Sequence, residues 1–283
     1  MRRETKRSHA LPPLLAVLVS LQFLASNAHH IVIAQVHGVS RASVSRAIKT
    51  FCQALCGLIN QFVVFPRDDM IPKTQKRFYA IAGFPDVIGA IDCTHIKIAG
   101  PTVNEEEYVN RKGFHSINVQ MICDPTFKFT NIVAKWPGSV HDARIWRESD
   151  ICAQFEREEI QGTLLGDSGY PCRKFLMTPY QAPQTQSQER FNNSLCKTRV
   201  LVEQSFGVLK RRFPCLSYGL RMKPSACLNV IGACVILHNM GFEFNDIFPR
   251  TCDDSREIPI VSDYQGPSTG SSYRDFIANA FFN

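Results

Sequence analysis

The order of apolar segments between residues 87 and 240 constrains the fold most strongly. Three short runs with the residue types of β-strands come first, at 87–93, 117–123 and 129–136. A helical stretch at about 141–157, a strand-like run at 163–167, a helix that ends near Arg212, before Pro214, and an apolar helix over 225–240 follow. Because strands that follow one another directly pair readily as hairpins, this order predicts an α/β domain with a mixed sheet.

The composition fits a packed globular protein. Of 283 residues, 45% are hydrophobic and 20% are charged, which leaves room for one large domain or for a small domain joined to a larger one. The 11 cysteines are odd in number and include no Cys-x-x-Cys pair, so a zinc ribbon or a thioredoxin-type motif is not expected. We therefore expect free thiols and a reducing compartment.

The apolar stretch from Leu14 to Ala25 has two interpretations. A basic start and the small residues after the stretch resemble a secretory signal peptide, which would make the protein a secreted one. Alternatively, the stretch is a buried helix with Pro12 and Pro13 in its first turn, where proline is tolerated. We favour the helix, and because the stretch is too short to span a bilayer we expect no membrane partner.

Residues 28–58 have the pattern of a helix-turn-helix. One helix ends at Gly38, Ser40 caps the next, Ala34 is small enough for a helix crossing, and Val44 and Ile48 lock the second helix. The alternative is an ordinary helical hairpin with a solvated polar face. Seven basic residues against one acid in the first 50 residues favour a DNA-binding element. The side chains expected to read bases and phosphates are those of Arg41, Ser43, Ser45, Arg46 and Lys49, with Ala42 beside them.

Three acids fall where an α/β sheet could bring them together. Asp92 and Asp167 each end a strand-like run, and Glu203 borders the apolar stripe of the helix that ends near Arg212. Each acid also has an ordinary interpretation: a turn at Asp92, an Asp-Ser-Gly turn at Asp167, and a surface pair between Glu203 and Arg199. We expect Glu203 to point toward the sheet edge, and Gly207, one turn later, to let another group approach closely.

A cluster of three carboxylates requires a counter-charge. Hard divalent cations such as Mg²⁺ or Mn²⁺ bind oxygen ligands of this kind. Two such ions can activate an attacking oxygen and stabilise the leaving oxygen in an in-line phosphodiester displacement. The acids and the basic front end together predict chemistry on DNA.

The chain resembles the Harbinger (PIF) transposase-derived nucleases, a family of the DDE-transposase superfamily with a ribonuclease-H-like core. The resemblance covers about residues 11–244, and several motifs in the same order are more specific than any one of them. The motifs, in chain order, are "HGVSRASVSRAI", "GAIDCTHIKI", "YVNRKGFHSINVQMICD", "WPGSVHDARIW", "GDSGYPC", "VEQSFGVLKRRF" and "ILHNM".

The resemblance implies that Asp92, Asp167 and Glu203 are the catalytic, metal-binding acids, and 35 residues (168 to 202) separate the last two. It implies Asp142 as a fourth metal ligand, although an acid at a helix N-terminus also complements the helix dipole. The histidines beside these acids, His95 and His141, are expected to be structural. Phosphate contacts are expected from Lys210, Arg211 and Arg212. Cys93 stands where the family usually has Gly, so its side chain is either harmless or crowds the metal site.

The resemblance also implies partners and a location. The family's nucleases commonly act beside a separate Myb-like DNA-binding protein that helps to bring them into the nucleus. We therefore expect DNA and a Myb-like protein as partners, and the nucleus, with the cytoplasm as a second compartment. The sequence sets no oligomeric state.

The expected organisation has three parts. Residues 1–60 form a small helical helix-turn-helix region, 80–244 form the ribonuclease-H-like α/β domain, and 245–283 form an acidic flexible tail with a short terminal helix. The leading hypothesis for function is a divalent-metal-dependent DNA endonuclease. The alternative is a domesticated, catalytically silent DNA-binding or adaptor protein that retains the fold.

Overall fold

A computed structural model describes residues 11–244 and 269–283, so part of the predicted tail and the first ten residues lie outside the described chain. Its centre is a sheet of five strands in the order β3-β2-β1-β4-β5. The strands are β1 (Val87–Lys97), β2 (Ser116–Cys123), β3 (Phe129–Pro137), β4 (Thr163–Leu165) and β5 (Leu176–Met177). The β1–β2 and β2–β3 pairs are antiparallel, and β4 runs parallel to β1 and to β5. The predicted mixed sheet is confirmed, and β5 is an addition to it.

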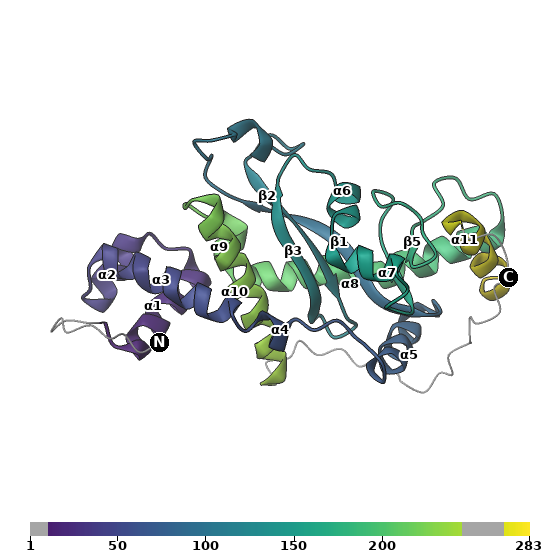
Figure 1. Cartoon of the computed structure of the whole chain (residues 1–283), viewed down its shortest axis with the longest axis horizontal. Helices are drawn as coiled ribbons and strands as arrows, with labels where there is room; N and C mark the ends of the chain where they lie inside the picture. The colour runs from purple at the N-terminus through teal and green to yellow at the C-terminus, as the bar shows by residue number, and fades with distance from the viewer. Residues whose placement is uncertain (1–10, 245–268) are drawn as a thin grey trace.

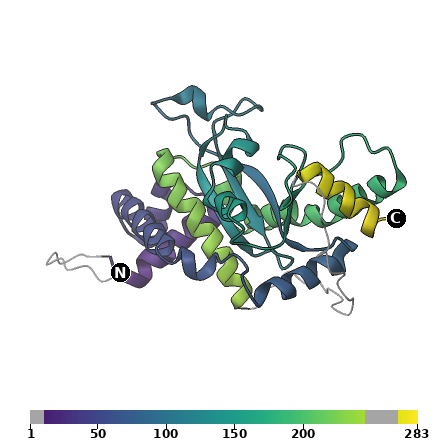
Figure 2. The same ribbon diagram turned by 45° about the vertical axis from the view of Figure 1, so that its right-hand side comes forward.

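Helices cover both faces of the sheet (Figure 2). One face packs against α5 (Met70–Ala82), α8 (Gln186–Arg212) and α10 (Pro224–Glu243) in a core that includes Phe206 and Met121. The other face packs against α6 (Asp142–Arg147) and α7 (Asp150–Glu156) in a second core around Trp146 and Phe155. This mixed sheet with flanking helices fits a ribonuclease-H-like fold.

The N-terminal helices lie at one end of the molecule (Figure 1). They are α1 (Pro13–Ser26), α2 (His30–His37) and α3 (Arg41–Cys56). The predicted helix at the apolar stretch is confirmed as α1, with proline in its first turn. Gly38 ends α2 at a φ of 62°, and the Ser40 side chain accepts a hydrogen bond from Ser43 N–H at the start of α3. These helices pack on one another, on α10 and on α9 (Pro214–Tyr218).

Shorter elements complete the described chain. A 3₁₀ turn (Glu105–Tyr108) lies in the β1–β2 connection, and α4 (Ile59–Phe62) follows the N-terminal helices. Near the other end of the molecule, α11 (Gly270–Phe281) covers the segment where a terminal helix was expected. It packs on α8 and β5. The segment at 141–157, expected as one helical stretch, is divided into α6 and α7 by the buried Ser149, which caps α7.

Two observations bear on the expected environment. By length and apolar composition alone, α10 is a candidate membrane span, but most of it is buried among α3, α4 and β3, as in a core helix. All ten cysteines of the described residues are free, as expected, and the sulfurs of Cys215 and Cys234 lie 3.9 Å apart.

Candidate active site

The candidate site is built on β1, whose side chains alternate between the two cores. Ala90 belongs to the core under α8, whereas Ile91 belongs to the core under α7. Asp92 accordingly faces α8, and Cys93 faces the other side, where its sulfur lies 3.2 Å from the Tyr170 hydroxyl. The Cys93 side chain therefore points away from α8 and lies close to the carboxyl of Asp142, which begins α6 (Asp142–Arg147).

The Arg199 guanidinium connects two of the predicted acids. Its Nη1 donates to Asp92 Oδ2 at 3.2 Å, and its Nη2 forms an ion pair with Glu203 Oε1 at 2.7 Å. The Asp92 and Arg199 side chains are only 15% and 17% exposed, whereas that of Glu203 is 51% exposed. The ordinary surface pair expected between Arg199 and Glu203 is present, and it is joined to Asp92 in one cluster.

The groups around Asp92 shift its pKa. Burial raises the pKa of this carboxyl to about 6, and the charges of Asp167 and Asp142 also raise it. The Cys93 N–H, which donates to Oδ1 at 2.7 Å, and the Arg199 guanidinium lower it. Both other acids are thus close enough to act electrostatically on Asp92.

Asp167 and Asp142 approach Asp92 from different elements. Asp167 follows the end of β4, and its Oδ1 accepts a hydrogen bond from Gly169 N–H at 2.9 Å, so the expected Asp-Ser-Gly turn is present. Asp142 begins α6, and its Oδ1 accepts a hydrogen bond from the Asn118 side chain on β2 at 2.9 Å. Its position at a helix N-terminus is favourable for a negative charge.

The acids do not form a closed metal cage. Among the residues that the structure describes, no three His, Cys, Asp or Glu side chains gather closely enough to hold an ion together. The donor chemistry nevertheless fits a hard divalent cation, because carboxylate charges converge on Asp92 and a cation, the Arg199 guanidinium, already bridges two of them. The contact between Arg199 and Asp92 was not expected from the sequence.

Two of the three basic residues at the end of α8 make inward hydrogen bonds that the sequence did not predict. Lys210 donates from Nζ to Thr94 Oγ1 at 2.7 Å and to the His95 carbonyl at 3.2 Å, so it is bound to β1. Arg212 donates to the His238 carbonyl at 3.1 Å and lies over the Phe242 ring. Both side chains thus reach inward to neighbouring elements, and of the three basic residues only Arg211 is exposed. The phosphate contacts expected from all three stay a prediction.

Gly207 also differs from the expectation. A Cβ at this position would meet nothing within 4 Å, so no group of the described chain approaches closely there. The chain itself does not make the expected close approach, and the glycine leaves open space one turn beyond Glu203.

The two histidines beside the acids have different roles. His95 Nδ1 lies 3.0 Å from Ser116 Oγ, and burial lowers the pKa of the ring, as is typical of a structural histidine. His141 is exposed at the N-cap position of α6. The outward residues expected on α3 are exposed or half-buried, with Arg41, Arg46 and Lys49 all exposed.

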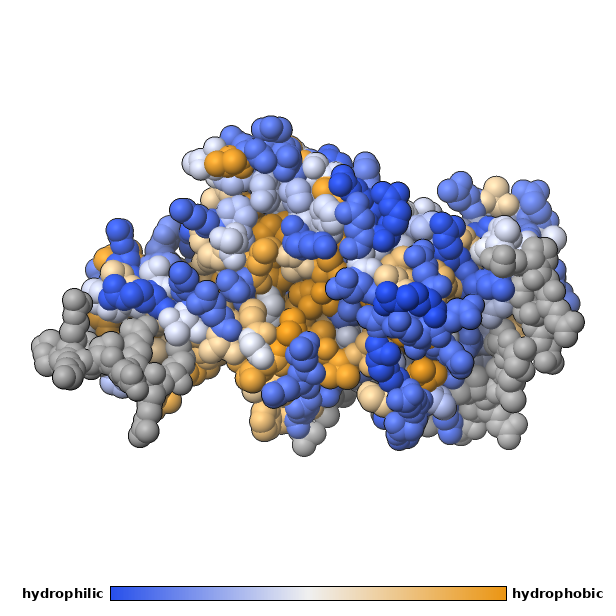
Figure 3. All heavy atoms as spheres, viewed as in Figure 1, coloured by the Kyte–Doolittle hydropathy of each residue, from blue (hydrophilic) through white to orange (hydrophobic). Residues whose placement is uncertain are grey.

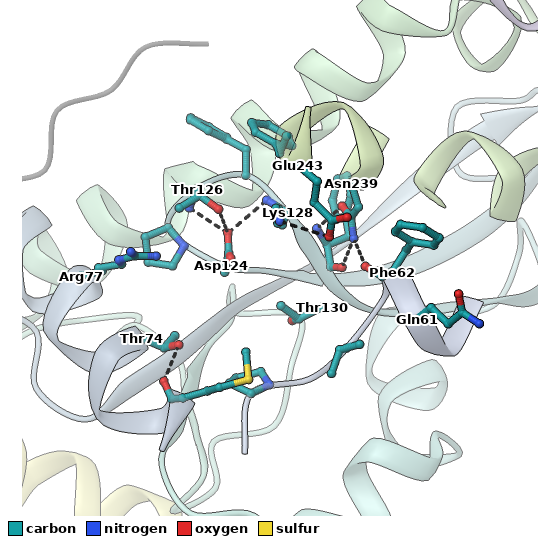
Figure 4. Close-up of a pocket in the computed structure, with 17 residues that line it drawn as sticks. Gln61, Phe62, Thr74, Arg77, Asp124, Thr126, Lys128, Thr130, Asn239 and Glu243 are labelled. Carbon is teal, nitrogen blue, oxygen red and sulfur yellow. Dashed lines mark hydrogen bonds and ion pairs between the residues drawn. The ribbon is translucent and has the colours of Figure 1, made fainter. Parts of the chain in front are cut away.

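A pocket of about 640 Å³ lies apart from the acids, between α5, the β2–β3 turn and the end of α10. Figure 3 shows apolar residues gathered on this face of the molecule, over β3 and toward α10. In Figure 4, Asp124 accepts hydrogen bonds from Thr126 and from Lys128 N–H, and Asn239 bonds to backbone atoms of Phe62 and Phe129. Burial raises the pKa of Asp124. These polar groups stabilise the turn and anchor α10, and none of the predicted site residues lines the pocket.

Known proteins are similar to the part of the chain that carries this site. Residues 91–239 match the DDE superfamily endonuclease family, and this span begins just before Asp92. The human protein named "Putative nuclease HARBI1" is 35% identical over 94% of this chain and 78% of its own length. Its Xenopus laevis counterpart is 31% identical over 97% and 81%, and the Arabidopsis thaliana "Protein ALP1-like" is 28% identical over 84% and 62%. No solved structure matches the chain. The matched family and these relatives show that the chain belongs to the Harbinger-derived DDE superfamily endonucleases.

Proposed function

We propose that this nuclease is a divalent-metal-dependent DNA endonuclease whose site is formed by Asp92, Asp167, Glu203 and Asp142. The observation that carries the proposal is the set of acids around Asp92: the charges of Asp167 and Asp142 act on it directly, and Arg199 joins it to Glu203. Carboxylates that lie this near one another repel, and a bound divalent cation would relieve that repulsion.

The chain's own residues have separable roles in this proposal. Asp92 and Glu203 would hold Mg²⁺ or Mn²⁺ from β1 and α8, with Asp167 and Asp142 completing the oxygen ligands. When bound, two such ions activate an attacking oxygen and stabilise the leaving oxygen of an in-line phosphodiester displacement. Glu203 is half exposed and free to turn toward the cation, while the Cys93 N–H fixes the orientation of Asp92. Lys210, held at Thr94 on the same face of β1, adds positive charge near the DNA phosphates.

We also propose that residues 30–50 dock on DNA as a helix-turn-helix. The outward side chains of α3 carry three positive charges, from Arg41, Arg46 and Lys49, with the Ser43 and Ser45 hydroxyls among them. Helix α3 is capped at Ser40 and anchored through the buried Val44 and Ile48, so it presents this face rigidly. A Myb-like protein partner and action in the nucleus complete the proposal.

A silent DNA-binding or adaptor protein is the second candidate. The observation that favours it is the Arg199 guanidinium, which already neutralises two of the acids without any metal. In that case the fold and the α3 surface would be used, and the acids would not.

Nicking of supercoiled plasmid DNA in Mn²⁺ distinguishes the two. The endonuclease proposal expects metal-dependent nicking by the wild type that is lost in Asp92→Ala and in Glu203→Ala. Glu189→Ala removes an exposed acid from the same helix and is the matched control, for which nicking is expected to be unchanged. Wild-type DNA binding without nicking, unaffected by the Asp92 and Glu203 changes, would favour the silent protein.

A further inference from the structure

Arg199 lies where the proposed function needs a cation. The guanidinium contacts the Asp92 and Glu203 carboxylates at 3.2 and 2.7 Å and is 17% exposed. A buried carboxylate beside other acids is costly without a counter-charge, and this arginine supplies it from within the chain.

The two contacts differ in how firmly they are held. The bond to Asp92 joins α8 to β1 across 107 positions of sequence and is largely screened from water by the surrounding chain. The ion pair with Glu203 is made within one helix, at a spacing of four residues, to a side chain that is 51% exposed. Glu203 can therefore exchange partners by a side-chain rotation, whereas Asp92 changes partner only when the guanidinium itself withdraws.

We infer that Arg199 is the resident counter-ion of the acid site, which a divalent cation must displace from Asp92 and Glu203, and that a DNA phosphate then receives the released guanidinium. This inference rests on the proposed endonuclease function and adds to it a positioning residue that couples metal loading to DNA binding.

The chemistry of arginine supports the second half of the inference. Its planar guanidinium binds carboxylate and phosphate groups by the same paired geometry, so a phosphodiester can replace the carboxylates that a metal takes. Lys210 donates a hydrogen bond to Thr94, which lies two residues after Asp92 on β1. It therefore places a second positive charge on the same side of the strand as Asp92. Metal and DNA are thus expected to bind cooperatively. A metal bound to the acids releases Arg199 for a DNA phosphate, and a phosphate bound to Arg199 leaves the acids open to the metal.

Mn²⁺ titration by calorimetry, without DNA, tests the first half. Arg199→Gln is expected to bind Mn²⁺ about tenfold more tightly than the wild type, the equivalent of about 1.4 kcal/mol, because the internal competitor is gone. Arg190→Gln removes one exposed charge from the same helix and is expected to leave the affinity unchanged. Arg199→Lys keeps one charge but cannot pair with both carboxylates, so we expect an intermediate affinity, and this variant also replaces Arg199→Gln if that protein fails to fold.

A purely structural arginine gives a different result. In that case Arg199→Gln lowers both the melting temperature and the affinity for Mn²⁺, whereas the inference expects the affinity to rise even where the melting temperature falls. Adding a short DNA duplex is expected to tighten Mn²⁺ binding by the wild type more than by Arg199→Gln.

The failures are distinguishable. Equal or weaker Mn²⁺ binding by Arg199→Gln and Arg199→Lys overturns the inference and leaves the endonuclease proposal intact. Absence of Mn²⁺ binding in all variants, with and without the duplex, overturns both.

Discussion

At the scale of the residue, the site depends on contacts between positions far apart in sequence. The sequence identifies Asp92, Asp167 and Glu203 as candidates because each ends a strand-like run or borders an apolar stripe. The strand end and the turn expected at Asp92 are wrong, because β1 continues past Asp92 to Lys97, paired with β2. It also identifies the pair between Arg199 and Glu203 from their spacing. It does not reveal that the same guanidinium reaches Asp92, because a tertiary contact between a helix and a strand leaves no local pattern.

The same reasoning applies to the basic end of α8. A run of Lys210, Arg211 and Arg212 at a helix end is equally consistent with DNA contacts and with inward hydrogen bonds. The charge of each side chain follows from its residue type, but the direction in which it points depends on the packing of α8 against β1 and α10.

Asp86 provides a test of electrostatics that is independent of the acid site. Burial raises the pKa of this carboxyl from 3.8 to about 6, partly offset by a hydrogen bond from the Thr163 hydroxyl. Between these pH values the folded protein keeps a proton that the unfolded chain releases. The free energy of unfolding therefore falls as pH rises through about 4 to 6.

Asp86→Asn removes the titrating carboxyl, so we expect the free energy of unfolding to fall less between pH 4 and 6 than it does in the wild type. At pH 7 the variant is expected to be more stable by about 1–3 kcal/mol. Asparagine suits this position because the backbone φ is 62°, and its side-chain oxygen still accepts from Gln75. Urea unfolding at pH 4 and pH 7 measures the effect, with Asp69→Asn, at a side chain that is 81% exposed, as the control. A loss of stability at pH 7 in Asp86→Asn would contradict the assignment.

At the scale of the element, prediction worked where the apolar pattern was strong. The runs that became β1, β2 and β4 are buried along much of their length, and β3 is buried at its first two residues. The apolar stripe of α8 beside Glu203 is buried too. Helix α5 was not predicted, because only Phe78 of its residues is fully buried and the apolar pattern is weak. Strand β5 was not predicted, because two residues are too few to show a periodic pattern.

Gly207 allows a prediction about α8. Because a Cβ there would meet nothing within 4 Å, Gly207→Ala is expected to stabilise the protein by up to about 1 kcal/mol through helix propensity. Gly232→Ala in α10 is the matched control, since its Cβ would lie 2.9 Å from the Cys56 sulfur and no gain is expected. Chemical denaturation measures both, and a Gly207→Ala protein that is less stable than the wild type would show that the position is crowded.

At the scale of the whole molecule, the described chain joins an exposed basic helix face to an acid site through a continuous core. Helix α3 packs on α10, which packs on the sheet that carries Asp92. The proposed DNA-docking surface and the proposed site of cleavage are thus parts of one packed body.

Salt dependence tests the docking surface. Replacing Arg41, Arg46 and Lys49 together by Gln is expected to weaken binding to duplex DNA and to reduce the slope of log affinity against log salt by about 0.9 for each phosphate that the protein no longer neutralises. Replacing Lys73, Lys76 and Arg77 of α5 by Gln removes the same number of exposed charges elsewhere. Equal weakening in the two triple variants would mean that net charge, and not the α3 face, governs binding.

The proposed function requires, above all, that the acids around Asp92 bind a divalent cation. The most direct test is Mn²⁺ binding, followed by electron paramagnetic resonance of the free ion, in the presence of a fixed amount of duplex DNA. We predict saturable binding by the wild type, beyond that of the duplex alone, which disappears in Asp92→Ala and is retained in Glu189→Ala. A folded wild type that binds no Mn²⁺ beyond the duplex, or an Asp92→Ala protein that binds it equally well, would contradict a cation site at Asp92.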